Sequence, residues 1–127
     1  MMKLFFVVGG IIGAIALGLD AFAAHGLKKI ITTANATDII DSFKTAVRYQ
    51  LNAGIFLLVI FSIYQVKPSL FLVGASACQL IGALLFCGSI YLKTFFPHIS
   101  FTAVAPLGGI TLMVSWLLVA FHALFSL

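Results

Sequence analysis

The chain has 127 residues, of which 63% are hydrophobic and 8% are charged, and its formal net charge is +4. A soluble domain of this size normally carries about 25% charged residues, because it must cover a large surface in water. The composition therefore excludes an ordinary soluble protein and indicates a lipid bilayer as the main surrounding. The basic residues are scattered along the chain without a basic face, so no nucleic-acid partner is expected.

Four apolar runs predict four membrane-spanning helices, at about 4–26, 43–65, 69–92 and 101–126. Each run reaches the ~20 residues that a helix needs to cross a ~30 Å hydrocarbon core. Backbone polar groups must be bonded internally in lipid, which favours helices, and short connections make neighbouring helices antiparallel. We therefore expect an all-α fold, one integral membrane four-helix antiparallel bundle that forms a single domain over residues 1–127.

The first span has some features of a cleavable signal peptide, namely Lys3, an apolar run and the small residues of Ala21-Phe22-Ala23. The apolar run is longer than the usual 7–15 residues of a signal peptide, and Asp20 would sit at the cleavage site. We therefore expect an uncleaved membrane helix.

The second span is expected to begin as a helix at the membrane surface. Asp38 is a plausible N-cap, and after it Ile39, Ile40, Phe43 and Val47 fall near one face at helical spacing. This pattern predicts an interfacial helical start that continues into the span.

Polar residues separate the remaining spans. Lys67-Pro68 ends the second run, and Lys93 with Phe96-Pro97-His98 separates the third from the fourth. Cys78 and Cys87 are roughly 13 Å apart along one helix axis, which is too far for a disulfide.

Two of the histidines and the single tryptophan are candidate ligands or packing residues. His98 and His122 lack partners at metal-ligand spacing, so each is expected to be a satisfied interfacial histidine. Trp116 lies mid-span and is expected to pack inside the bundle or to find a polar partner. No metal site and no cofactor are expected.

Small residues recur every four positions in two spans, a spacing that lets helix backbones approach closely. The rows are Gly10, Ala14 and Gly18, with Gly9 and Gly13 as a neighbouring row, and Gly74, Cys78 and Gly82. Gly108 and Gly109 are expected to bend or closely pack the start of the fourth helix. Each row either packs within one bundle or faces another subunit, and with two strong rows we expect a homo-oligomer.

Polar side chains cluster where the first span ends and the second begins: Asp20, His25, Lys44, Arg48, Tyr49, Gln50 and Asn52. A hairpin would bring Asp20 and Arg48 to similar depth, and pairing would offset the roughly 2.5–3.5 kcal/mol cost of an isolated charge in lipid. His25 lies about 140° around the helix from Asp20, which makes those two poor partners. We expect an Asp20–Arg48 pair that acts as a polar clamp, with a proton or ion relay as the alternative.

Basic residues also predict the orientation. One side of the membrane would hold Lys28, Lys29, Lys44, Arg48 and Lys93, and the other Lys3 and Lys67. The positive-inside rule then places both termini outside the cytoplasm.

Several segments match one family in the right order: Ala21–Leu27 (AFAAHGL), Tyr49-Gln50, Phe86–Tyr91 (FCGSIY), Ala105–Gly109 (APLGG) and Trp116. Together they resemble the domain-of-unknown-function 423 family of small bacterial membrane proteins, over nearly the whole chain. The resemblance implies a four-helix inner-membrane protein and supplies no established activity. The family usually has glycine at the positions of Asp20 and Ala23 and histidine at that of Ala53, so Asp20 is a feature of this sequence.

Two functions remain open at this point. The first is a non-enzymatic structural or membrane-homeostasis protein that acts as an oligomer. The second is a small transporter or channel with a polar path near Asp20, His25 and Arg48. An apolar midplane that is packed shut would favour the first, and a polar cavity continuing across the membrane from Asp20 would favour the second. An enzyme is not expected, because acid, base and nucleophile are not assembled at any visible spacing.

Overall fold

The computed structural model describes residues 2–32, 34–96, 98 and 103–126. Over these residues the chain forms α-helices and no strand: α1 (Met2–Ala24), α2 (Gly26–Ile30), α3 (Ala36–Val66), α4 (Leu70–Phe95) and α5 (Val104–Ser126). All except the short α2 are long and apolar enough to cross a membrane. The expected all-α fold with four apolar helices is therefore confirmed. The predicted break at Pro97 and the first residues of the predicted fourth span lie outside the described residues.

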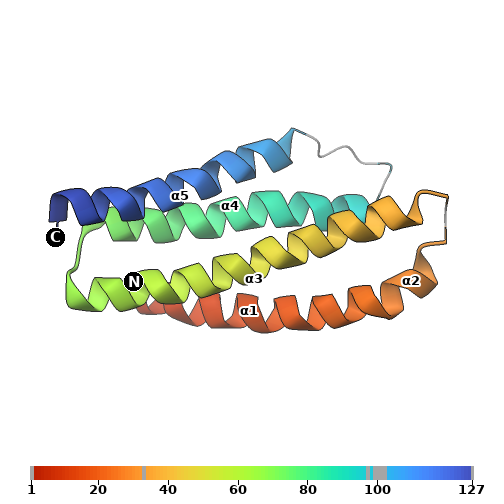
Figure 1. The fold of residues 1–127 in the computed structure, drawn as a ribbon, viewed down its shortest axis with the longest axis horizontal. Helices are drawn as coiled ribbons and strands as arrows, with labels where there is room; N and C mark the ends of the chain where they lie inside the picture. Colours follow the sequence, from red (N-terminus) through yellow and green to blue (C-terminus); the bar gives the residue numbers. More distant parts are fainter. Residues whose placement is uncertain (1, 33, 97, 99–102, 127) are drawn as a thin grey trace.

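The long helices lie side by side and antiparallel, in chain order (Figure 1). α1 packs against α3, α3 against α4, and α4 against α5, while α1 touches α4 only slightly. Both ends of the chain lie at the same end of the bundle. Because α1 and α5 occupy the two outer positions, each leaves a broad face that no other described helix covers.

α1 contributes only a narrow stripe to the core. Its buried residues recur every seven positions: Met2, Gly9, Ala16 and Ala23. A seven-residue repeat keeps one seam facing a neighbouring helix. At Gly9 an added Cβ would lie 2.9 Å from the Leu57 Cβ and 3.0 Å from the Gly54 carbonyl oxygen. The neighbouring row of Gly9 and Gly13 therefore packs α1 on α3.

α3 begins earlier than predicted. Asn35 occupies the N-cap position, and Asp38 lies within the first turn. With 31 residues, α3 is about 46 Å long, longer than the ~30 Å hydrocarbon core. Its length fits the predicted interfacial start, although the N-cap assignment of Asp38 was wrong.

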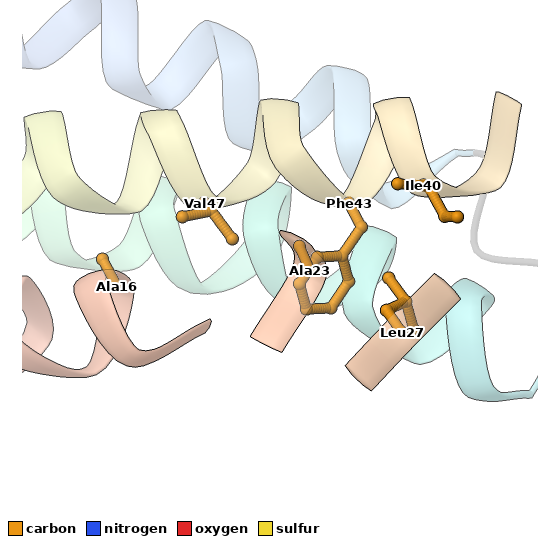
Figure 2. Close-up of a cluster of buried hydrophobic side chains, with 6 residues drawn as sticks. All are labelled: Ala16, Ala23, Leu27, Ile40, Phe43 and Val47. Carbon is orange, nitrogen blue, oxygen red and sulfur yellow. The ribbon is translucent and has the colours of Figure 1, made fainter. Parts of the chain in front are cut away.

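The beginning of α3 is held on the end of α1 and on α2 by a cluster around Phe43. Phe43 is fully buried and its ring lies between Ala23 and Leu27 (Figure 2). Ile40 and Val47 extend the same cluster along α3. Three of the four residues of the predicted face of α3 therefore lie in the core, while Ile39 is half-buried outside this cluster. The short α2 places Leu27 in the same buried cluster as Phe43.

α4 begins immediately after Pro68, as the sequence indicates, with Ser69 as the N-cap. The Phe71 amide donates to Ser69 Oγ at 3.1 Å, which satisfies one of the free N–H groups at a helix start.

The α4–α5 contact is a seam of glycines. A Cβ at Gly82 would lie 2.9 Å from the Leu112 amide nitrogen and 3.0 Å from the Gly108 oxygen. A Cβ at Gly74, of the same row, would lie 3.4 Å from Leu118 Cδ1, and Cys78 is half-buried. The row of the third span therefore packs within the chain. Gly108 closely packs the start of α5, as predicted, whereas a Cβ at Gly109 would meet no atom within 4 Å beyond its own helix and chain neighbours, so the expected close packing does not extend to Gly109.

Candidate functional site

Two glutamines lie in the interior of the bundle, with 9% of Gln50 and 3% of Gln79 exposed. Gln50 is fully engaged. Its Nε2 donates to the Ile12 carbonyl at 3.0 Å, and its Oε1 accepts from the Tyr91 hydroxyl at 2.6 Å. We call these three residues the Gln50 clamp. The clamp ties α1, α3 and α4 together at one level.

One turn along α3, a thiol adds a further polar contact. Cys87 is buried and free, and its Sγ donates to the Ala46 carbonyl at 3.1 Å. Thiols are weak donors, so this bond supplements the Gln50 clamp rather than replacing it.

Gln79 lies in different surroundings. Its Oε1 is buried and has no hydrogen-bond partner among the described residues. Gln79 lines a groove of about 670 Å³ between α3, α4 and α5, which we call the α3–α5 groove. The lining residues are Tyr49, Asn52, Gln79, Phe86, Pro106, Gly109, Ile110, Leu112, Met113, Trp116 and Leu117. Three of them carry hydrogen-bonding side chains that suit the groove to a ligand, and Trp116 could add its indole N–H.

Aromatic pairs border the α3–α5 groove. Trp116 stacks on Phe56 with ring centroids 4.0 Å apart and an interplanar angle of 12°. Tyr49 packs edge-on against Phe86 at 4.9 Å. Trp116 is 58% exposed, so the expectation that it packs inside the bundle was wrong. It lies at the border because α5, among the described helices, packs mainly on α4.

The predicted polar cluster does not form one site. Gln50 enters the clamp, whereas Tyr49 and Asn52 reach the α3–α5 groove. Asp20 and His25 are exposed. Successive helix positions are about 100° apart, so Gln50 reaches α1 and α4, whereas its neighbour Tyr49 lines the groove between α3, α4 and α5.

The expected Asp20–Arg48 pair is not formed. Both side chains are exposed, and no ion pair joins them in the part of the chain that the structure describes. The bond from Gln50 to Ile12 sets the antiparallel register of α1 and α3. In that register Asp20 lies level with the turn of α3 that precedes Arg48. Lys44, on that turn, is half-buried. The polar contact between α1 and α3 that was expected from Asp20 and Arg48 is made by the side-chain amide of Gln50 instead.

His122 also departs from its prediction. It is 1% exposed and neither ring nitrogen has a partner among the described residues. It is therefore buried in the bundle rather than a satisfied interfacial histidine. Ser115, seven residues earlier on the same face, donates to the Ala75 carbonyl at 2.7 Å. No three His, Cys, Asp or Glu side chains come together in metal-ligand geometry within the described ranges.

Sequence reasoning missed Gln79, and the signal for it was weak. An amide inside a predicted span points to a polar contact, but α4 faces both α3 and α5, and the pattern does not say which neighbour it meets. Gln50 was found because it stands beside other polar residues.

Comparison with known proteins relates this chain to a family of membrane proteins of unknown function. The family model described as "Protein of unknown function (DUF423)" matches residues 19–109. The chain is similar to UPF0382 membrane protein YwdK of Bacillus subtilis, with 29% identity over 96% of this chain and 97% of that protein. A UPF0382 membrane protein of Haemophilus influenzae is 32% identical over 86% and 84% of the two chains. No solved structure matches.

Proposed function

This chain belongs to the DUF423 family, and we propose that it is a non-enzymatic structural or homeostasis protein of the membrane that acts as a homo-oligomer. It is a multi-pass membrane protein, by its relatives and its four apolar helices. The observation that carries the proposal is an outward-facing row of small residues on α1.

The row consists of Gly10, Ala14 and Gly18. All three are exposed, and a Cβ built at Gly10 or Gly18 would meet no atom within 4 Å apart from its own helix and chain neighbours. The other small residues behave differently, since Gly9 and Gly82 are each in close contact with a neighbouring helix. Small residues at this spacing drive helix association in lipid by letting backbones approach. A second copy of α1 is a partner of the right shape.

The transporter alternative receives less support. Asp20, His25 and Arg48 are exposed near one end of the bundle and do not converge. Further along, the contact between Gly9 and Gly54 leaves no room for a polar path between α1 and α3. The same outward placement of ionisable groups supports the non-enzymatic proposal, because acid, base and nucleophile must meet at one point to act together.

The proposed location is the bacterial inner membrane with both termini outside the cytoplasm. The termini share one end of the bundle (Figure 1). The connections at the opposite end and their flanks hold most of the basic residues, namely Lys28, Lys29, Lys44, Arg48 and Lys93. The positive-inside rule favours that end as the cytoplasmic one.

Cysteine crosslinking in vesicles tests the oligomer. Ala14→Cys, in a Cys78→Ala background that keeps the buried Cys87, places a thiol in the α1 row. Leu84→Cys is the matched control, because Leu84 is exposed near the middle of α4. Mild oxidation should give a covalent dimer for Ala14→Cys and little for Leu84→Cys. Equal yields from the two variants, or no dimer from Ala14→Cys, would refute the proposed interface.

A further inference from the structure

Gln79 lines the α3–α5 groove and carries a buried side-chain oxygen that the described residues leave unsatisfied. Gln79 is 3% exposed and its Oε1 has no donor within the described residues. Burying a carbonyl without a hydrogen bond is costly, and lipid tails offer no donor. The fold satisfies the comparably buried Gln50 at both ends of its amide. Among the described side chains with a buried unpartnered atom, which also include Ser76 and His122, Gln79 is the one that lines the groove, and its missing partner therefore points to a group from outside the chain.

The depth of Gln79 restricts what can supply that group. Along the helix axis Gln79 lies roughly 14 Å from Leu70 and roughly 24 Å from Phe95. A position that far from both ends of α4 falls within a ~30 Å hydrocarbon core. Lipid headgroups stay at the boundary of that core. A molecule that is itself mostly apolar can carry a donor to this depth.

The walls of the groove indicate the shape of that molecule. Its volume of about 670 Å³ is in the range of small-molecule sites. Trp116, Phe86 and Tyr49 line it with aromatic rings, and rings stack well on rings. Asn52 adds an exposed amide on the α3 side. Met113 on α5 contributes a flexible wall that adapts to a ligand.

We infer that the α3–α5 groove binds a ring-containing apolar alcohol or phenol from the bilayer, whose hydroxyl donates to Gln79 Oε1. A hydroxyl both donates and accepts, so it can bond the carboxamide in either orientation of the amide. The site lies on α3, α4 and α5, away from the α1 row, and does not depend on the proposed oligomer.

Tryptophan fluorescence tests this inference directly, because Trp116 is the one tryptophan of the chain and borders the groove. The full chain in phosphatidylcholine vesicles is titrated with 4-(4-bromophenyl)cyclohexanol and with its methyl ether. The two probes share a ring system and a bromine that quenches tryptophan on contact, and only the alcohol donates a hydrogen bond. The alcohol should quench at an about tenfold lower concentration in the membrane, the ratio expected for one hydrogen bond. Equal quenching by both probes would overturn the inference, because the groove would then take any apolar chain.

Two variants assign the effect to the groove. Gln79→Leu should abolish the advantage of the alcohol and leave quenching by the ether unchanged, while Gln65→Leu, at an exposed glutamine of α3 outside the groove, should keep the advantage. Met113→Phe places a larger and more rigid side chain in the wall of the groove and keeps Trp116 as the one tryptophan. It narrows the site for both probes, so quenching by both should fall.

Two outcomes count against the site. A Gln79→Leu protein that still prefers the alcohol would exclude Gln79 as the acceptor. Quenching that falls as the protein-to-lipid ratio rises would mean that a second copy of the chain covers the groove, which would also overturn the inference.

Discussion

Gln50 and Gln79 are both buried amides on neighbouring helices, and they differ in what surrounds them. Gln50 lies where α1, α3 and α4 meet, and both ends of its amide are bonded within the chain. Gln79 lies beside the α3–α5 groove with its oxygen unbonded. The comparison shows that burial alone does not identify the role of a polar side chain in lipid. What separates the two is whether a neighbouring helix comes close enough to supply a partner.

The difference has its origin in glycines. Gly9, Gly13 and Gly54 bring α1 and α3 into backbone contact, so the Ile12 carbonyl comes within reach of Gln50. Gly82 and Gly108 do the same for α4 and α5. α3 and α5 share no such seam, and the space between them is the α3–α5 groove.

The largest expected effect breaks the glycine contact between α4 and α5 beside the groove. Gly108→Ala places a Cβ against the Phe86 backbone and 2.9 Å from the Gly82 oxygen. Backbone cannot move aside as a side chain can, so α4 and α5 must separate, at a cost of about 3 kcal/mol of unfolding free energy. Reversible unfolding by SDS in mixed micelles measures this loss.

Gly109→Ala is the matched control, because a Cβ at Gly109 would meet no atom within 4 Å beyond its own helix and chain neighbours. It should be neutral or slightly stabilising, since alanine is the better helix former. If both alanine variants unfold alike, the close approach of α4 and α5 is not what holds this half together.

A smaller effect is expected when Gln50 is made to resemble Gln79. Tyr91→Phe removes the hydroxyl and leaves Gln50 Oε1 without its donor. The loss should be about 1 kcal/mol of unfolding free energy, the usual size for one hydrogen bond. Tyr64→Phe removes a hydroxyl from a half-buried tyrosine of α3 outside the clamp and should change stability by less. A Tyr91→Phe protein as stable as its parent would mean that the Gln50 clamp adds nothing.

Much of the fold could be predicted from the sequence, because membrane thickness sets the length of an apolar run and glycine spacing marks close helix contacts. The rows of Gly9 and Gly82 were found in this way. Their packing partners were not predictable from spacing. The row of Gly10 is as regular as that of Gly9, and only the rotation of α1 decides which faces α3.

The candidate site was harder to predict for the same reason. Asp20 and Arg48 were expected to pair because charges in lipid need partners, yet both lie on outer faces. Trp116 was expected inside and borders a groove that exists because α5 packs mainly on α4. A shift of one residue along a helix turns a side chain by about 100°. Because a membrane helix is hydrophobic all round, its sequence does not show which side of the helix faces a neighbouring helix.

The most direct test of the contrast between the two glutamines is to measure Gln50→Leu and Gln79→Leu side by side. Gln50→Leu removes both bonds of the clamp and leaves the Tyr91 hydroxyl without its partner, so about 2 kcal/mol of unfolding free energy should be lost. Gln79→Leu replaces an unbonded buried amide with an apolar side chain of similar size, so it should lose no unfolding free energy and should gain about 1 kcal/mol. Equal losses in SDS unfolding would contradict the account, because Gln79 would then be as much a part of the folded framework as Gln50.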